Sequence, residues 1–171
     1  MRSFIGSPIE NSEEFSELLE SLSFHREINP VSMNNIHLTY LFLSDINDSQ
    51  KNIAIKRLQQ LKFKALTCRV NSLKTLPERS TPRVIVVVLD CPELSDISHA
   101  LKETFSVNIN RTQSFLPHIT VGRYRKHSNP ISLESVKLDI SAVKLKQICL
   151  YKSTLTESGS IYEKLYCKEP V

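Results

Sequence analysis

Glycine is scarce in this chain, with only three among 171 residues. A doubly wound nucleotide-binding sheet needs a glycine-rich turn between its first strand and helix, and the sequence contains no such turn. The strands and helices predicted below alternate along the chain all the same. We therefore expect an α+β fold made of two lobes, not a parallel nucleotide-binding sheet.

Long apolar segments are missing as well. The longest apolar run, "RVIVVVLDC" from Arg83 to Cys91, is far shorter than the roughly 20 residues that a membrane-spanning helix needs. The first fifteen residues, "MRSFIGSPIENSEEF", also lack a long apolar stretch. We expect a soluble, cytoplasmic protein that does not bind membranes.

The four cysteines show no metal-binding pattern. They are widely separated, form no C-x-x-C pair and have no histidine at metal-ligand spacing: Cys68, Cys91, Cys149 and Cys167. Free cysteines are among the most buried residues in proteins. We therefore expect four buried, reduced thiols and no metal site.

A strongly basic stripe for nucleic acids is missing too. The net charge is +4 and the pI is near 8.9, a mild excess that suits an anionic partner without identifying one. With 40% hydrophobic and 23% charged residues, the composition is that of an ordinary globular protein that can bury a core.

Two apolar segments carry the same polar pair. "IHLTYLFL" at residues 36–43 contains His37 and Thr39, and "PHITVGRY" at residues 117–124 contains His118 and Thr120. Because side chains alternate along a strand, each pair shares one face while its apolar neighbours share the other. Two such pairs among five histidines would arise by chance with a probability of only about 3%.

The order of predicted elements repeats in the two halves of the chain. In each half a strand leads into a helix and then into the strand with the histidine. In the first half these are a strand over residues 3–9, a helix from Asn11 or Ser12, and a strand over 36–43. In the second half they are a strand over 83–90, a helix from Pro92, and a strand over 116–124. The remaining predictions are a helix over 48–61 capped by Asp48 or Ser49, a strand over 65–72, a loop at 108–113, a short helix over 132–137, and strands over 143–153 and 161–167. We infer a structural duplication that brings both polar pairs to a common cleft.

Two histidines that face one another can act as an acid and a base. Near neutral pH one imidazole can accept a proton while the other donates one. Displacement at phosphorus needs both transfers, and threonine hydroxyls can bind the nonbridging phosphate oxygens. The other histidines have loop or helix-surface contexts and are expected to be non-catalytic: His25, His99 and His127.

The segments "HLTY" and "HITV" resemble the H-x-T-x motifs of the 2H phosphoesterase superfamily. The wider sequence is similar to its RNA 2′,3′-cyclic phosphodiesterase branch, also called 2′-5′ RNA ligase or LigT, in the segments "MRSFIG", "NNIHLTYLFLSD", "TPRVIVVVLD", "FLPHITVGRY" and "LYKSTLTESGSIYEKL". The resemblance covers nearly the whole chain in order. It implies one bilobal α+β domain over residues 1–171, with two pseudo-symmetric lobes of antiparallel sheet and helices around a central cleft.

The resemblance also implies an activity. It indicates a phosphoric diester hydrolase that opens RNA-terminal 2′,3′-cyclic phosphates to 2′-phosphates without a metal or cofactor. The expected substrates are RNA ends or nucleotides bearing that group, and the expected oligomeric state is a monomer. The same resemblance makes His37 the proton donor to the departing 3′ oxygen and His118 the base that activates water, with Thr39 and Thr120 holding the phosphate.

Arg123 stands where members of the family often have an arginine after the second motif. On strict strand alternation Arg123 points away from the face of His118. Phosphate binding by Arg123 therefore requires the strand to bend or end near Gly122, and the alternative is a solvated cation at a strand end. One departure from the family is Ser44, which replaces a frequent glycine.

Several alternatives remain open at this point. The same two histidines could catalyse the reverse reaction, in which a 2′,3′-cyclic phosphate end is joined to a 5′-hydroxyl end. A second alternative is a non-catalytic module that binds RNA or nucleotides, and a third is a structural α+β domain with chance motifs. Both intact histidines favour catalysis over binding alone.

Overall fold

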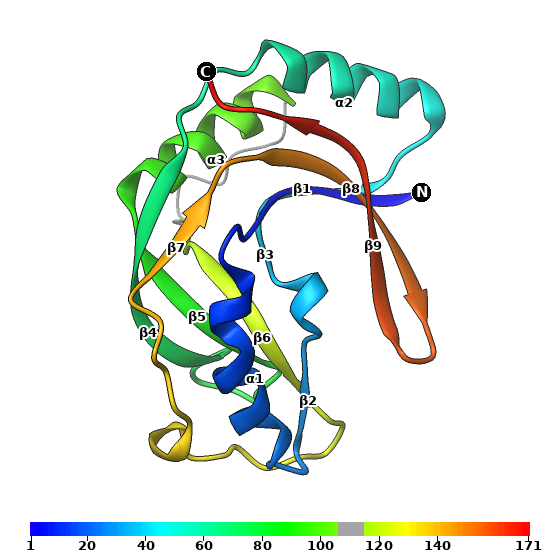
Figure 1. Ribbon diagram of the computed structural model, residues 1–171. Helices are drawn as coiled ribbons and strands as arrows, with labels where there is room; N and C mark the ends of the chain where they lie inside the picture. Colours follow the sequence, from blue (N-terminus) through cyan, green and yellow to red (C-terminus); the bar gives the residue numbers. More distant parts are fainter. Residues whose placement is uncertain (106–114) are drawn as a thin grey trace.

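The computed structural model describes residues 1–105 and 115–171 (Figure 1). The loop predicted at 108–113 lies outside the described residues. In the described residues the strands form one antiparallel sheet of nine: β1 (Arg2–Pro8), β2 (Ile28–Pro30), β3 (His37–Asp45), β4 (Leu66–Leu76), β5 (Val84–Asp90), β6 (His118–Tyr124), β7 (Ala142–Leu145), β8 (Ile148–Thr156) and β9 (Gly159–Lys168). The helices are α1 (Ser16–Ser23), α2 (Asp48–Gln60) and α3 (Pro92–Thr104), with short 3-10 turns η1 (Ser12–Phe15), η2 (Met33–Asn35) and η3 (Leu133–Ser135).

The sheet consists of two halves that meet at the histidine strands. The strand order is β7-β4-β5-β6-β3-β1-β8-β9, with the short strand β2 paired to β6. Between β6 and β3 the only backbone pairing in the described residues is that of Leu38 with Ile119. The α+β class and the two related lobes predicted from the sequence are confirmed.

The helices join the two halves. Helix α1 follows β1 of one half but packs on β2 and β6 of the other, and α3 follows β5 but packs on β3. In Figure 1 α1 lies beside β6 and β2, whereas α2 and α3 lie at the opposite end of the molecule. Each copy of the repeated unit therefore buries its helix against the partner copy.

One buried cluster forms the main core. The apolar residues of both motif strands belong to it, with exposed fractions between 0% and 4%: Leu38, Tyr40, Ile119 and Val121. This burial confirms the predicted alternation at the start of each motif. The opposite face of β3 and β6 at these positions carries the two histidines and two threonines, and we call it the histidine face.

Each histidine strand contains an extra residue at the same place in its motif, and β3 has a second register shift further along, at Leu43. The pairing of β3 with β1 skips Tyr40, and the pairing of β6 with β5 skips Val121, so each strand has a β-bulge three residues after its histidine. The carbonyl oxygens of the extra residues are bonded from outside the ladder: the Ser98 hydroxyl of α3 donates to Tyr40, and the Val31 amide donates to Val121.

The bulges reverse the alternation that the sequence predicts. In both strands the extra residue and the one after it are buried, Tyr40 with Leu41 and Val121 with Gly122. The next residue is exposed in each case. Because one residue has been inserted, this next residue returns to the histidine face.

Two of the three glycines stand next to these bulges. A Cβ atom at Gly6 of β1 would collide with the backbone carbonyl oxygen of Leu38. A Cβ atom at Gly122 would lie 2.9 Å from Cγ2 of Ile28 in β2. The close approach of these strands therefore requires glycine at both positions.

Several predicted boundaries differ from the structure. The cap of α2 is Asn47, in a capping box with Gln50, and not Asp48 or Ser49. The predicted helix from Asn11 or Ser12 begins as the turn η1, because the Asn11 side chain bonds the backbone of β7 instead of capping. The predicted strand over 143–153 is divided, since β7 pairs with β4 and β8 crosses to pair with β1.

The prediction of reduced cysteines is wrong. Cys68 is bonded to Cys91, with Cα atoms 5.3 Å apart, and Cys149 to Cys167, with Cα atoms 4.1 Å apart. Cys149 stands directly opposite Cys167 in the β8–β9 pair. Sequence separations of 23 and 18 residues do not indicate such pairings, because only the strand register brings the partners together.

None of the helices in the described parts of the chain is long and apolar enough to cross a membrane.

Replacing Gly6 with alanine should destabilise the protein by about 3 kcal/mol, the upper end for overpacking, because the new methyl group meets a backbone carbonyl that cannot rotate away. Urea unfolding measures the change. Ser44→Gly, which introduces a glycine instead of removing one, is the control. Ser44 has a φ of 58°, a conformation that glycine adopts more easily, so the Ser44→Gly variant should be as stable as wild type or more stable. An unchanged midpoint for Gly6→Ala would contradict the close approach at the bulge.

Candidate active site

The two histidines begin neighbouring strands at the centre of the sheet. Leu38 pairs with Ile119, and each of these residues follows its histidine directly. In an antiparallel pair, extending this register by one residue in each direction sets His37 opposite Thr120 and Thr39 opposite His118. The four predicted motif residues therefore form a compact group on the histidine face.

Both imidazoles are fixed in the same way. Nδ1 of His37 donates a hydrogen bond to the Asn35 carbonyl oxygen at 2.6 Å, and Nδ1 of His118 donates one to the Leu116 carbonyl oxygen at 2.8 Å. A carbonyl oxygen can only accept, so Nδ1 carries a proton in both rings. Nε2 of each ring is the atom left for proton transfer to or from a bound substrate.

The environment of His37 lowers its proton affinity. Burial is the largest cause that holds the pKa of His37 below its ordinary value of 6.5, and the positive charges of Arg123 and His118 lower it further. The bond to the Asn35 carbonyl oxygen opposes these effects without cancelling them. In the free protein at neutral pH, His37 is therefore mainly neutral.

Arg123 reaches the histidine face because of the bulge at Val121. Its charge acts on His37, which stands on the neighbouring strand. Arg123 is exposed, and no bulge-free strand would bring it to this side. The sequence requires the strand to bend near Gly122 if Arg123 is to face the phosphate, and the bulge provides this bend. The position of β3 that corresponds to Arg123 is occupied by Phe42, which is 70% exposed.

Aromatic rings surround His37 on its other sides. Its ring centroid lies 5.0 Å from that of Phe4 and 4.9 Å from that of Tyr162, which meets it edge-on. Phe4 in turn stacks on Tyr151 at 4.8 Å. Burial raises the pKa of Tyr151, so its hydroxyl stays protonated. Sequence reasoning missed these neighbours, since they come from strands at the two ends of the chain.

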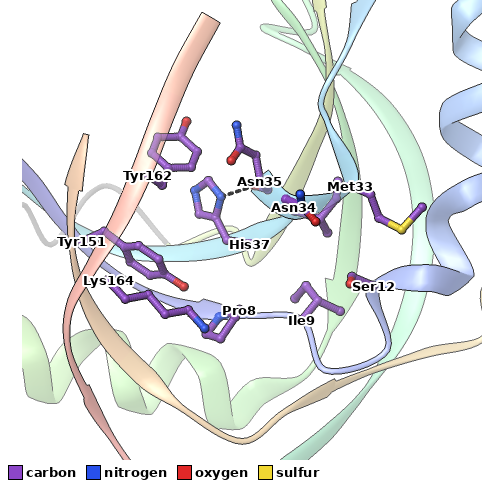
Figure 2. Close-up of a pocket in the computed structure, with 11 residues that line it drawn as sticks. Pro8, Ile9, Ser12, Met33, Asn34, Asn35, His37, Tyr151, Tyr162 and Lys164 are labelled. Carbon is purple, nitrogen blue, oxygen red and sulfur yellow. Dashed lines mark hydrogen bonds between the residues drawn. The ribbon is translucent and has the colours of Figure 1, made fainter. Parts of the chain in front are cut away.

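A pocket of about 260 Å³ opens beside His37 (Figure 2). Its walls come from the end of β1, from η2 and from the hairpin of β8 and β9, and they include Ile9, Asn34, Tyr151, Tyr162 and Lys164. Within residues 1–105 and 115–171, no three His, Cys, Asp or Glu side chains are grouped so that they could hold a metal ion.

Comparison with known proteins gives consistent matches. The family described as "LigT like Phosphoesterase" matches residues 5–86, a range that contains the first motif. The chain is 30% identical to a Methanocaldococcus jannaschii protein named "RNA 2′,3′-cyclic phosphodiesterase", over 95% of this chain and 97% of that one. A protein of the same name from Archaeoglobus fulgidus is 26% identical, over 96% and 98% of the two chains.

Solved structures show the same fold. A crystal structure of a Thermus thermophilus protein superposes with a TM-score of 0.82 at 21% identity, over 99% of this chain and 97% of that one. The structure of Escherichia coli LigT with 3′-AMP superposes with a TM-score of 0.79 at 17% identity, over 99% and 97%. With similarity in sequence and in fold along the whole chain, the protein belongs to the LigT-like family of 2H phosphoesterases.

Proposed function

We propose that the protein hydrolyses RNA-terminal 2′,3′-cyclic phosphates to 2′-phosphates, with His37 and His118 as the acid and the base. The observation that carries this proposal is the matched pair of imidazoles, each bonded through Nδ1 to a carbonyl of its own chain segment. The relatives named RNA 2′,3′-cyclic phosphodiesterase support the reaction class. The LigT structure solved with 3′-AMP shows that a protein of this fold binds a ribonucleotide.

The proposed reaction is an in-line displacement at phosphorus. His118 takes a proton from water as the water oxygen bonds to phosphorus, and the bond from phosphorus to the 3′ oxygen breaks on the opposite side. His37 gives its proton to that 3′ oxygen, so the ring opens and the 2′-phosphate remains. Thr39 and Thr120 donate hydrogen bonds to the nonbridging oxygens, and Arg123 balances their charge.

The low proton affinity of free His37 fits this scheme once the substrate is bound. The phosphate brings a negative charge between His37 and Arg123, and an opposite charge nearby raises the pKa of a histidine. His37 therefore gains its proton with the substrate and holds it until the 3′ oxygen departs. In the protein without substrate, His37 is neutral in most molecules.

The nearest alternative is ligation, in which the hydroxyl of a 5′-hydroxyl end attacks the phosphorus in place of water and the 3′ oxygen leaves as before. The same five residues would serve either nucleophile, and the product distinguishes the two reactions: a ligated 2′-5′ strand or a 2′-phosphate. We also propose that residues 1–171 act as one bilobal, monomeric, cytoplasmic enzyme, because one chain supplies all five residues and RNA is an intracellular substrate. The cytoplasmic location is proposed from the substrate alone, because the two disulfides are a feature that cytosolic proteins seldom carry.

Substitution of each histidine should affect substrates differently. His118→Ala removes the base, so kcat/KM should fall by about 10² to 10⁴ for every substrate. His37→Ala removes only the acid, so a nitrophenyl phosphodiester, whose leaving oxygen is already a stable anion, should lose far less than a cyclic phosphate. Circular dichroism confirms that both variants fold. If His37→Ala lost activity on both substrates while His118→Ala kept activity on the nitrophenyl ester, the two roles would be exchanged. Full activity in both variants would contradict the proposed enzymatic function.

Removal of the Arg123 charge should raise the pKa of His37. In Arg123→Gln the positive charge that disfavours the imidazolium is gone, so an NMR titration of the free protein should find the pKa of His37 above that of wild type. The maximal rate should fall roughly ten- to a hundredfold with the lost phosphate contact. Lys126→Gln, three residues further along, is the charge-matched control and should leave the pKa unchanged. A lower or equal pKa in Arg123→Gln would place Arg123 away from the histidine face.

Hydrolysis should not depend on a divalent metal ion. The two imidazoles supply the proton transfers that a metal-bound water would otherwise supply. We expect the rate on a short, unstructured RNA with a cyclic phosphate end to be the same with and without excess EDTA. Loss of activity in EDTA, restored by a divalent ion, would contradict the two-histidine mechanism.

A further inference from the structure

Of the five residues proposed to act on the phosphate, His37 alone lines the pocket, and the other walls of the pocket have no part in the reaction described above. Figure 2 shows His37 at one side of the pocket, with Tyr151 and Lys164 reaching into it from β8 and β9. Asn34 and Ser12 line it from the opposite side, on η2 and η1. The pocket is thus continuous with the acid side of the proposed active site.

The chemistry of the lining suits an anion. The described lining side chains include an ammonium, two amides and three hydroxyls, but no carboxylate. Lys164 is exposed and, like most lysines of the chain, forms no ion pair with a carboxylate of the described residues, so its charge can meet an anion. Burial keeps the Tyr151 hydroxyl protonated through a raised pKa, so it can donate to a negative oxygen. A cation and neutral donors therefore converge on one volume of about 260 Å³.

The direction of the reaction determines which phosphate comes here. His37 protonates the 3′ oxygen, so the ribose of the terminal nucleotide lies on the His37 side of the phosphorus and the attacking water on the His118 side. The 5′ carbon of that ribose is only a few bonds from the 3′ oxygen and carries the phosphate that links the nucleotide to the rest of the strand. We propose that the pocket binds this 5′ phosphate, with Lys164 as its cation, and so makes RNA ends better substrates than nucleoside cyclic phosphates. This inference rests on the proposed function.

A pair of small substrates tests the inference. Adenosine 2′,3′-cyclic phosphate lacks a 5′ phosphate, and the same compound phosphorylated at its 5′ oxygen has one. In wild type the 5′ phosphate should raise kcat/KM by about tenfold at low salt, as expected for one charge-assisted contact at a partly exposed site. In Lys164→Ala most of this advantage should disappear, while the rate on the unphosphorylated compound stays within about twofold of wild type. Lys164→Arg should keep the advantage, and added salt should reduce it.

Lys152→Ala is the matched control. Lys152 follows Tyr151 directly on β8, so its side chain points to the opposite face of the same hairpin. The Lys152→Ala substitution removes the same charge without changing the pocket. It should leave the ratio of kcat/KM between the 5′-phosphorylated and unphosphorylated compounds unchanged. An equal loss in Lys152→Ala and Lys164→Ala would show a general charge effect and would overturn the inference.

Other outcomes separate the inference from the proposed function. If wild type hydrolyses both compounds equally well, the Lys164 subsite is refuted and the phosphodiesterase remains. If it hydrolyses neither, the proposed function fails. Calorimetry then measures the affinities of the same two compounds for wild type and for Lys164→Ala. The subsite requires that the 5′-phosphorylated compound bind more tightly than the unphosphorylated one to wild type but not to Lys164→Ala.

Discussion

The contact of Leu38 with Ile119 is the constraint on which the site depends. It is the point where the two half-sheets pair, and both side chains are fully buried. Because each follows a histidine directly, any change in the register of β3 against β6 would move the two imidazoles relative to one another. The helices α1 and α3 reinforce the contact, since each crosses to pack on the other half. The distance between the two imidazoles is thus set by core packing, not by polar contacts at the surface.

Much of this arrangement could be predicted from residues that follow simple periodicity. The pairs His37 with Thr39 and His118 with Thr120 stand on strands whose apolar neighbours are buried, as alternation requires. The bulges could not be predicted in this way, because an inserted residue changes the pairing without changing the local composition. In a chain with only three glycines, the positions of Gly6 and Gly122 are the sequence feature that corresponds to the close approach of strands beside the bulges.

Long-range pairings explain the remaining differences. The disulfides join residues that become neighbours only when β4 meets β5 and β8 meets β9. The aromatic rings around His37 come from β1, β8 and β9, so nothing near the motif in sequence indicates them. These rings also account for the burial that lowers the pKa of His37. A motif can identify the reacting groups, but their proton affinities depend on neighbours that only the fold supplies.

The matched bulges have a consequence for the symmetry of the candidate active site. A rotation that exchanges β3 with β6 also exchanges His37 with His118 and Thr39 with Thr120, so the motifs alone do not distinguish one side of the site from the other. The fifth residue after each histidine does, because the bulge brings Phe42 to the face in one copy and Arg123 in the other. A duplicated strand–helix–strand unit thus yields a centre without a built-in direction. Divergence at one equivalent position, to an aromatic ring in one copy and a cation in the other, gives that centre two unlike ends.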